Sequence, residues 1–264
     1  MSAATPPLTD SWADRVAGRT ALVTGAGNGL GRAIALALAA RGARVILVGR
    51  REAPLTEVAT EIGAARVASC DVSEPSAVKR LGDQLRDEEI SILVNNAGIA
   101  GPVAPLTDIE PVEWDEVFGA NVRSVYLMCR QFLPAMVFRG GGDVVNVASV
   151  TGKRPLTRRT PYAASKMAVI GLAATLATEV GPLGVTVNSL SPGPVDGPRM
   201  ARNFEREAVA AGVSVDEAKK AFVSRAALGR MVTEEEVGAA VIAMLHMPGL
   251  CGADIDLSAG MVAR

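Results

Sequence analysis

The chain has 264 residues, with 27 Lys plus Arg, 28 Asp plus Glu and one His, so its formal net charge at pH 7 is −1. This balance excludes the basic surface expected for non-specific binding to nucleic acid. Three widely spaced cysteines, without a CxxC pair, exclude a dense disulfide framework and favour a reducing compartment. The N-terminus lacks a signal-peptide pattern, and the longest strictly apolar run, 33–40, is far shorter than the roughly 18 residues of a membrane span. We therefore expect a soluble, cytoplasmic protein.

Short apolar runs that are typical of strands alternate with helix-like stretches along almost the whole chain. The strand candidates are 20–24, 44–48, 66–70, 90–94, 143–148, 185–190 and 253–257. The helix candidates are 29–40, 54–62, 75–87, 112–138, 161–180 and 233–246. This alternation predicts an α/β fold: a single doubly wound Rossmann-type domain, with a seven-stranded, mostly parallel sheet and helices on both faces.

The same pattern divides the chain into a short tail and one domain. Residues 1–17 are expected to form a flexible N-terminal tail, and 18–264 one dinucleotide-binding and catalytic domain. Residues 194–230 interrupt the alternation, and they are polar with helical stretches. We expect an insertion that forms a substrate loop, and an ordinary surface excursion is the alternative.

A glycine-rich turn lies between the first predicted strand and the first predicted helix. Residues 24–31 read TGAGNGLG, in which Gly25, Gly29 and Gly31 give the spacing TGxxxGxG instead of GxGxxG. Such a turn brings backbone amides and a helix N-terminus to a phosphate. Glycine also serves tight turns that bind nothing. The position between a strand and a helix favours dinucleotide binding.

Polar or glycine residues follow five of the predicted strands. They are residues 24–25, 70–71, 95–98, 149 and 191–193. In an open α/β sheet the ligand binds beyond the carboxyl ends of the strands, so these residues are expected to share one rim. Each of them alone could be an ordinary turn or cap.

Tyr162 and Lys166 are spaced one helical turn apart at the start of a long predicted helix. This spacing stacks the two side chains on one face. A tyrosine with its ordinary pKa near 10 exchanges protons poorly at neutral pH, and a nearby lysine cation lowers that pKa. The pair is therefore a candidate general acid/base. A buried tyrosine packed beneath a lysine stem is the structural alternative.

Taken in order, these motifs resemble the short-chain dehydrogenase/reductase family from Gly18 to Met261. The matching positions are 24–31, Asp71, 95–98, Asn121, Ser149, Tyr162, Lys166 and 192–193. The length resembles the shorter oxidoreductase branch of that family. The resemblance implies an NAD(P)-dependent enzyme that interconverts a secondary alcohol and a ketone by hydride transfer.

The resemblance also implies a role for each catalytic candidate. Tyr162 is the expected general acid/base, Ser149 positions the substrate oxygen, and Lys166 lowers the tyrosine pKa and holds the nicotinamide ribose. Asn121 holds a water in a proton relay in this family, and a purely structural helix kink is the alternative. The expected cofactor-binding residues are Gly25, Asn28, Gly29, Leu30, Gly31, Arg50, Asp71, Val72, Asn96, Ala97, Gly98, Tyr162, Lys166, Pro192, Gly193 and Val195. Gly197 stands where the family usually has a threonine that contacts the carboxamide.

The end of the second predicted strand indicates the cofactor. An acidic residue there would bind the ribose 2′-hydroxyl of NAD(H). This chain instead has Arg50 and Arg51, and its next carboxylate is Glu52. The guanidinium fork of Arg50 suits a 2′-phosphate, so we expect NADP(H), with NAD(H) as the alternative.

Lys153, Arg154, Arg158 and Arg159 make the segment between Ser149 and Tyr162 basic. These side chains could attract an anionic substrate, but solvated surface or a subunit contact is the more common role of such clusters. No metal-ligand cluster is visible in the sequence. The family resemblance implies a homo-oligomer, a tetramer or dimer, formed through the long helices on either side of Ser149, with a small-molecule carbonyl or alcohol as substrate. A catalytically silent nucleotide sensor and a non-redox lyase or isomerase remain alternatives.

Overall fold

The computed structural model describes residues 14–154 and 156–262. Its described part contains one seven-stranded sheet in which every strand pair is parallel, in the order β3-β2-β1-β4-β5-β6-β7. The strands are β1 (Thr20–Thr24), β2 (Arg44–Gly49), β3 (Arg66–Ser69), β4 (Ile90–Asn95), β5 (Gly142–Val147), β6 (Val185–Pro192) and β7 (Asp254–Leu257). The strand order reverses between β1 and β4, which confirms the doubly wound α/β fold and puts a switch point there.

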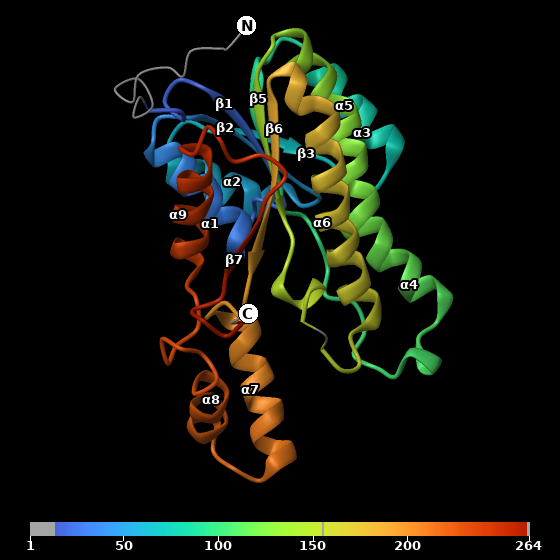
Figure 1. Ribbon diagram of the computed structural model, residues 1–264, viewed down its shortest axis with the longest axis vertical. Helices are drawn as coiled ribbons and strands as arrows, with labels where there is room; N and C mark the ends of the chain where they lie inside the picture. The colour runs from blue at the N-terminus through green and yellow to red at the C-terminus, as the bar shows by residue number, and fades with distance from the viewer. Residues whose placement is uncertain (1–13, 155, 263–264) are drawn as a thin grey trace, which may run out of the picture.

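Helices cover both faces of the sheet, with α1, α2 and α9 on one face and α3, α4, α5 and α6 on the other (Figure 1). The α-helices are α1 (Gly29–Ala40), α2 (Glu52–Ile62), α3 (Pro75–Gln84), α4 (Pro111–Phe118), α5 (Ser124–Phe138), α6 (Thr160–Val180), α7 (Pro198–Ala211), α8 (Val215–Val223) and α9 (Glu234–Leu245). The short helical turns are η2 (Leu106–Asp108), η3 (Gly119–Arg123), η4 (Val150–Gly152) and η5 (Gly181–Leu183).

The central strand β1 is buried along its whole length, and its three middle residues are apolar. In β1, Leu22 packs into the cluster beneath α5 and α6, whereas Ala21 and Val23 pack into the cluster beneath α1 and α9. Side chains alternate between the two faces of a strand, so a strand covered on both sides reads as one continuous apolar run. The predicted strand bounds agree with the structure to within two residues.

The largest difference from the predicted elements is the helix expected over 112–138. The structure divides it into α4, a π-helical turn η3 and α5. Asn121 lies in the π turn and is buried. A π turn inserts an extra residue into a helix and re-aims its side chains, and such turns are common at functional sites.

Residues 194–230 fold into α7 and α8 between β6 and α9. Both helices extend beyond the end of the sheet, at the bottom of Figure 1. The carboxyl ends of β5 and β6 point toward this region, because α6 begins there and α7 follows β6 directly. The insertion is therefore positioned at the ligand-binding side of the sheet.

The folded domain includes residues that were predicted to belong to the N-terminal tail. Residues 1–13 of that tail lie outside the described residues. The side chain of Val16 is fully buried in the cluster beneath α1 and α9, and Gly18 N donates to the carbonyl of Gly42 at 2.9 Å. The domain therefore starts before residue 18, because an apolar side chain three positions ahead of Arg19 completes its core.

Thr160–Leu183 is long and apolar enough to cross a membrane by length and composition alone. One face of this segment packs on the sheet through Val169, Ala173 and Ala177. A core helix of a globular protein has the same length and apolar composition, and the packing of this helix on the sheet accounts for its apolar residues.

Candidate active site

A cleft of about 1000 Å³ opens at the carboxyl ends of the strands. It brings together most of the residues expected at the cofactor and catalytic sites. Those that line it are Gly25, Asn28, Gly29, Leu30, Gly31, Asn96, Ala97, Gly98, Ser149, Tyr162, Lys166, Pro192, Gly193 and Val195. Four expected residues, Asn121, Arg50, Asp71 and Val72, are not among the described residues that line the cleft.

The cleft has two ends that we name by their residues. The glycine-rich end comprises Gly25, Asn28, Gly29, Leu30, Gly31, Asn96, Ala97 and Glu234. The tyrosine end comprises Ser149, Arg154, Leu156, Arg159, Tyr162, Lys166, Met200, Phe222, Arg225, Met261 and Val262.

The glycine-rich end is shaped by backbone atoms. Gly25 and Gly29 adopt positive φ angles of 66° and 52°, which glycine takes without strain. A Cβ on Gly31 would lie 2.1 Å from the carbonyl oxygen of Gly25 and 2.5 Å from Asn96 Nδ2. The helix α1 therefore approaches the turn closely because residue 31 has no side chain, and its N-terminal amides face the cleft.

Thr24 joins β1 to the turn that follows β4. Its hydroxyl oxygen accepts hydrogen bonds from the backbone N–H groups of Asn96, at 2.9 Å, and Ala97, at 3.0 Å. The Asn96 side chain returns the contact by donating to the Thr24 carbonyl oxygen at 3.0 Å. These reciprocal bonds fix the two loops at the switch point relative to each other.

Lys166 is buried at the tyrosine end. Its Nζ donates to the Val147 carbonyl oxygen at 2.8 Å and lies 5.9 Å from the centroid of the Tyr162 ring. Both residues lie on α6, one turn apart, as the sequence predicted. The structure therefore positions a lysine cation beside the tyrosine, which favours the phenolate form of the side chain.

Ser149 precedes the short turn η4 at the end of β5. Its Oγ accepts a hydrogen bond from the Thr151 backbone N–H at 3.2 Å. A hydroxyl that accepts one bond keeps its own proton to donate. Ser149 lines the cleft together with Tyr162, so its hydroxyl is available to a ligand oxygen there.

Asn121 lies behind the cleft and links two of its walls. Its Oδ1 accepts from Ile99 N at 2.7 Å, while its Nδ2 donates to Ile99 O and to Ser165 Oγ, both at 3.0 Å. Ser165 Oγ in turn donates to the Tyr162 carbonyl oxygen at 2.8 Å. The π turn therefore contains the buried Asn121, whose hydrogen bonds join the segment after β4 to α6.

The four basic residues of the 153–159 segment have different environments. Lys153 forms ion pairs with Asp254 and Asp256 of β7, and it therefore ties this segment to the sheet edge. Arg158 is exposed and does not line the cleft, whereas Arg154 and Arg159 do. Arg159 Nη1 donates to the carbonyl oxygens of Ala100 and Gly101 at 3.3 and 3.4 Å.

Arg50 and Asp71 follow the neighbouring strands β2 and β3, whose ends are joined by a 2.9 Å hydrogen bond from Cys70 N to Gly49 O. Partial burial opposes ionisation of Asp71, but hydrogen bonds from Ser73 and the charges of Arg50 and Arg123 outweigh it, so the pKa of Asp71 is lowered. An ionised Asp71 thus lies near Arg50, the predicted cofactor-binding cation, at the outer edge of the sheet.

The turn after β6 is tightly packed. A Cβ on Gly193 would lie 2.9 Å from Ser258 Cα, and Gly193 N donates to the Leu257 carbonyl oxygen at 2.7 Å. Gly197 is the N-cap of α7, and it lines the cleft where the family pattern has threonine. Val195 lies in an isolated parallel bridge with Val232, which brings the segment before α9 to the cleft.

Two charged residues that line the cleft were missed by the sequence analysis. Glu234 begins α9, and its Oε1 lies 3.7 Å from the position that a Cβ on Gly29 would take. Partial burial and the negative charge of Glu235 raise the pKa of Glu234, and they outweigh the opposite effect of the Arg32 charge. Arg225, just after α8, also lines the cleft. Both come from segments far from the motifs in sequence, so local patterns carried no signal for them.

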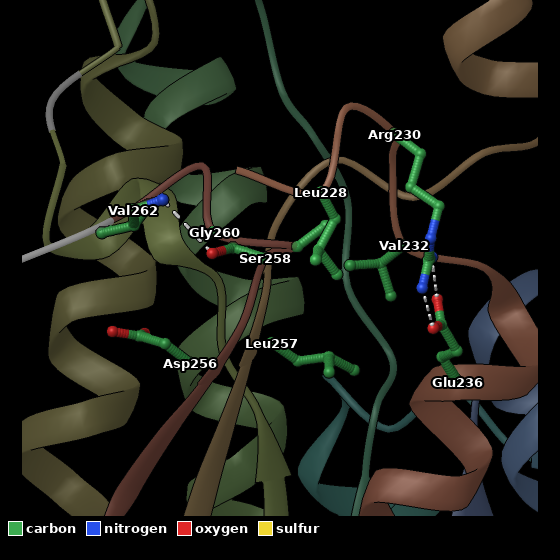
Figure 2. Close-up of a pocket in the computed structure, with 10 residues that line it drawn as sticks. Leu228, Arg230, Val232, Glu236, Asp256, Leu257, Ser258, Gly260 and Val262 are labelled. Carbon is green, nitrogen blue, oxygen red and sulfur yellow. Dashed lines mark hydrogen bonds and ion pairs between the residues drawn. The ribbon is translucent and has the colours of Figure 1, made fainter. Parts of the chain in front are cut away.

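A smaller pocket of about 290 Å³ lies beside the C-terminal segment (Figure 2). Arg230 reaches both carboxylate oxygens of Glu236 at 2.7 Å, as the dashed lines of Figure 2 show. Hydrogen bonds from Arg230 and from the Thr233 backbone lower the pKa of Glu236 to about 2. This ion pair holds the segment between α8 and α9 against the start of α9.

Comparison with known proteins identifies the family. The profile described as short chain dehydrogenase matches residues 19–208. The chain belongs to the short-chain dehydrogenase family. Membership confirms the expectation of an NAD(P)-dependent oxidoreductase that acts on alcohol and carbonyl groups.

Three similar proteins illustrate the range of this short-chain dehydrogenase's relatives. A putative ketoacyl reductase of the granaticin polyketide synthase from Streptomyces violaceoruber is 38% identical over 235 residues, 84% of each chain. A crystal structure of an actinorhodin polyketide ketoreductase with NADPH superposes with a TM-score of 0.86 at 32% identity, covering 92% of this chain and 97% of the other. A crystal structure of a protein named ribose-5-phosphate isomerase, from Brucella melitensis, gives a TM-score of 0.84 at 33% identity and covers 94% and 93% of the two chains.

Proposed function

We propose that this short-chain dehydrogenase uses NADP(H) to interconvert a ketone and a secondary alcohol, with Tyr162 as the general acid/base. One observation carries the proposal: the Tyr162–Lys166 pair and the glycine-rich turn line the same cleft. An acid/base pair at one end of a dinucleotide-sized cleft suits hydride chemistry on a carbonyl.

The glycine-rich end fits the phosphates of a dinucleotide. The closeness of Gly31 to the Gly25 carbonyl leaves the backbone uncovered, so the amides of this turn and of the start of α1 are available to phosphate oxygens. Lys166 would hold the nicotinamide ribose, and Arg50 would hold a 2′-phosphate. When bound, the cofactor supplies or accepts the hydride.

In the reduction direction, Tyr162 would give its phenolic proton to the carbonyl oxygen of the substrate. The Lys166 cation favours the phenolate that this step leaves behind. Ser149 would donate a hydrogen bond to the same oxygen and so orient the carbonyl. Asn121, through Ser165, would hold the backbone of Tyr162 in place, because these two residues form a hydrogen-bonded chain to the Tyr162 carbonyl.

A panel of ketones, aldehydes and secondary alcohols, assayed with both nicotinamide cofactors, tests the proposal. NADPH carrying deuterium at C4 makes the test specific: the proposal predicts one deuterium on the carbinol carbon of the product, detected by mass spectrometry. Isomerised or cleaved product without net NADPH oxidation would favour a non-redox function. The assay includes this outcome because the chain is similar to a protein named ribose-5-phosphate isomerase. Tight cofactor binding without turnover of any panel member would instead favour a nucleotide sensor.

The cofactor preference depends on Arg50 in this proposal. The absence of an acidic residue at the end of β2 and the NADPH bound to a structural neighbour both support NADP(H). Replacing Arg50 with Gln should raise the KM for NADPH about ten-fold or more and leave the KM for NADH nearly unchanged. Equal wild-type rates with the two cofactors would contradict this preference.

We further propose a cytoplasmic homo-oligomer, a tetramer or dimer, assembled through α5 and α6. Large apolar side chains are exposed on these helices, among them Tyr126 and Met167 at 47% and 48% of their full exposure. Apolar surface on neighbouring helices is typical of an interface. Light scattering coupled to gel filtration should give a mass two or four times that of one chain, and a monomer would contradict this proposal.

A further inference from the structure

Three arginines from two separate parts of the chain line the tyrosine end of the cleft. Arg154 follows η4, Arg159 precedes α6, and Arg225 follows α8. Among the described residues that line the whole cleft, the acidic one is Glu234, and it belongs to the glycine-rich end. The tyrosine end therefore has a local excess of positive charge, although the chain as a whole is nearly neutral.

Neutral groups hold two of these arginines in position. Arg154 Nη1 donates to the Met261 carbonyl oxygen, and the guanidinium carbon of Arg225 lies 5.1 Å from the centroid of the Phe222 ring. Neither contact removes the positive charge. In the part of the chain that the structure describes, neither arginine forms an ion pair, whereas the adjacent Lys153 is neutralised by two aspartates.

The surroundings of the arginines are those of an organic ligand site. Apolar side chains share the tyrosine end with them: Leu156, Met200, Phe222, Met261 and Val262. A cleft with apolar walls and charge of one sign concentrates ligands of the opposite sign. A guanidinium binds a carboxylate through two parallel N–H···O bonds, and each arginine has five N–H donors.

We propose that the substrate carries a carboxylate, bound by Arg154 and Arg225, in addition to the carbonyl or hydroxyl group that reacts. This inference rests on the proposed function and names the substrate class of the same site. Arg154 lines the same cleft as Ser149 and Tyr162, so an acid bound through its carboxylate occupies the cleft that contains both groups. The site selects keto acids or hydroxy acids over neutral ketones and alcohols.

Calorimetric titration of the NADP⁺-saturated protein tests this without turnover. The probes are succinate and its neutral counterpart succinamide. We expect succinate to bind at least ten-fold more tightly than succinamide, since only the anion forms charge-assisted bonds. Arg154→Gln and Arg225→Gln should each weaken succinate binding about ten-fold and leave succinamide binding unchanged.

Arg158→Gln is the matched control, because Arg158 is on the same loop and exposed but does not line the cleft. It removes the same charge and should leave the affinity for succinate unchanged. An equal loss in this variant, equal binding of the two probes, or no binding of succinate would overturn the carboxylate site. The steady-state readout should agree: 4-oxopentanoate should have a KM at least ten-fold below that of 4-oxopentanamide.

Results that reject the proposed function differ from those that reject only the carboxylate site. In that case the wild-type protein would not bind NADP⁺ in the first titration, or it would reduce neither 4-oxopentanoate nor the neutral members of the ketone panel. Binding of NADP⁺ and reduction of neutral ketones, without preference for succinate or the keto acid, would instead retain the proposed function and reject the carboxylate site alone.

Discussion

The two ends of the cleft differ in whether backbone atoms or side chains form their walls. At the glycine-rich end, backbone atoms and absent side chains define the shape, and an added Cβ at Gly31 would lie 2.1 Å from a carbonyl oxygen. At the tyrosine end, side chains from the β5 loop, α6, α8 and the C-terminal segment define both shape and charge. The first end is therefore sensitive to a side chain added at Gly31, whereas the second is sensitive to changes in side-chain charge and polarity.

Gly31→Ala should have the largest effect at the glycine-rich end. The new methyl group would collide with Gly25 O, so α1 would have to move away from the turn and the phosphate site would open. We expect NADPH affinity, measured by fluorescence titration, to fall at least about 100-fold. Gly171→Ala is the control, since no atom lies within 4 Å of its Cβ position and it lies within α6. That variant should keep the affinity and gain up to about 1 kcal/mol of stability from helix propensity.

Thr24→Val should destabilise the switch point. Valine has nearly the shape of threonine but leaves the N–H groups of Asn96 and Ala97 without their acceptor. The expected loss in the free energy of unfolding is about 1–3 kcal/mol, measured by urea denaturation. Thr24→Ser keeps the hydroxyl and should lose less than half as much. Equal losses in the two variants would show that methyl packing, and not the hydrogen bonds, matters at this position.

Glu234→Gln should tighten cofactor binding several-fold at pH 7, because it removes a negative charge from the glycine-rich end. The raised pKa of Glu234 gives the sign of the pH effect. The protonated form of Glu234 therefore stabilises the folded protein, fully so below the unfolded-state pKa. The same form does not repel an anionic ligand. Both effects are lost as pH rises through the folded-state pKa.

The comparison between wild type and Glu234→Gln, titrated with NADPH from acid to neutral pH, isolates this group. The difference in affinity should grow with pH and then level off. Glu179→Gln is the control, because Glu179 is exposed near the end of α6 and does not line the cleft. A difference that is independent of pH would contradict an effect of the Glu234 charge.

The sequence predicted the backbone-built part of the molecule well. Apolar runs and the glycine spacing are local patterns, so α1 and β1 were predicted with the bounds that the structure has. Asn121 was expected at the site from the family resemblance, with a structural helix kink as the alternative, but the π turn around it was not predicted. That turn depends on bonds from Asn121 to Ile99 and Ser165, which only the folded chain brings together.

Charge at the tyrosine end was the harder feature to predict. Lys153 and Arg154 are adjacent basic residues that the sequence does not distinguish. In the structure Lys153 pairs with two aspartates of β7, whereas Arg154 lines the cleft. These two aspartates, and the Met261 carbonyl oxygen to which Arg154 donates, lie about 100 residues away in the sequence. Arg225 and Glu234 were missed for the same reason, since each reaches the cleft from the end of a helix that is far in sequence from the predicted motifs.

The proposed function assigns the cofactor phosphates to the glycine-rich end of the cleft and proton transfer to the tyrosine end. Tyr162→Phe tests this division most directly, because the substitution removes a single oxygen at the tyrosine end. NADPH affinity and carbonyl reduction are measured on the same preparation, by fluorescence titration and by loss of NADPH absorbance. We predict cofactor affinity within about two-fold of wild type and a fall in kcat of about 100-fold or more. Reduction at the wild-type rate, or loss of cofactor binding together with turnover in a folded protein, would contradict the division.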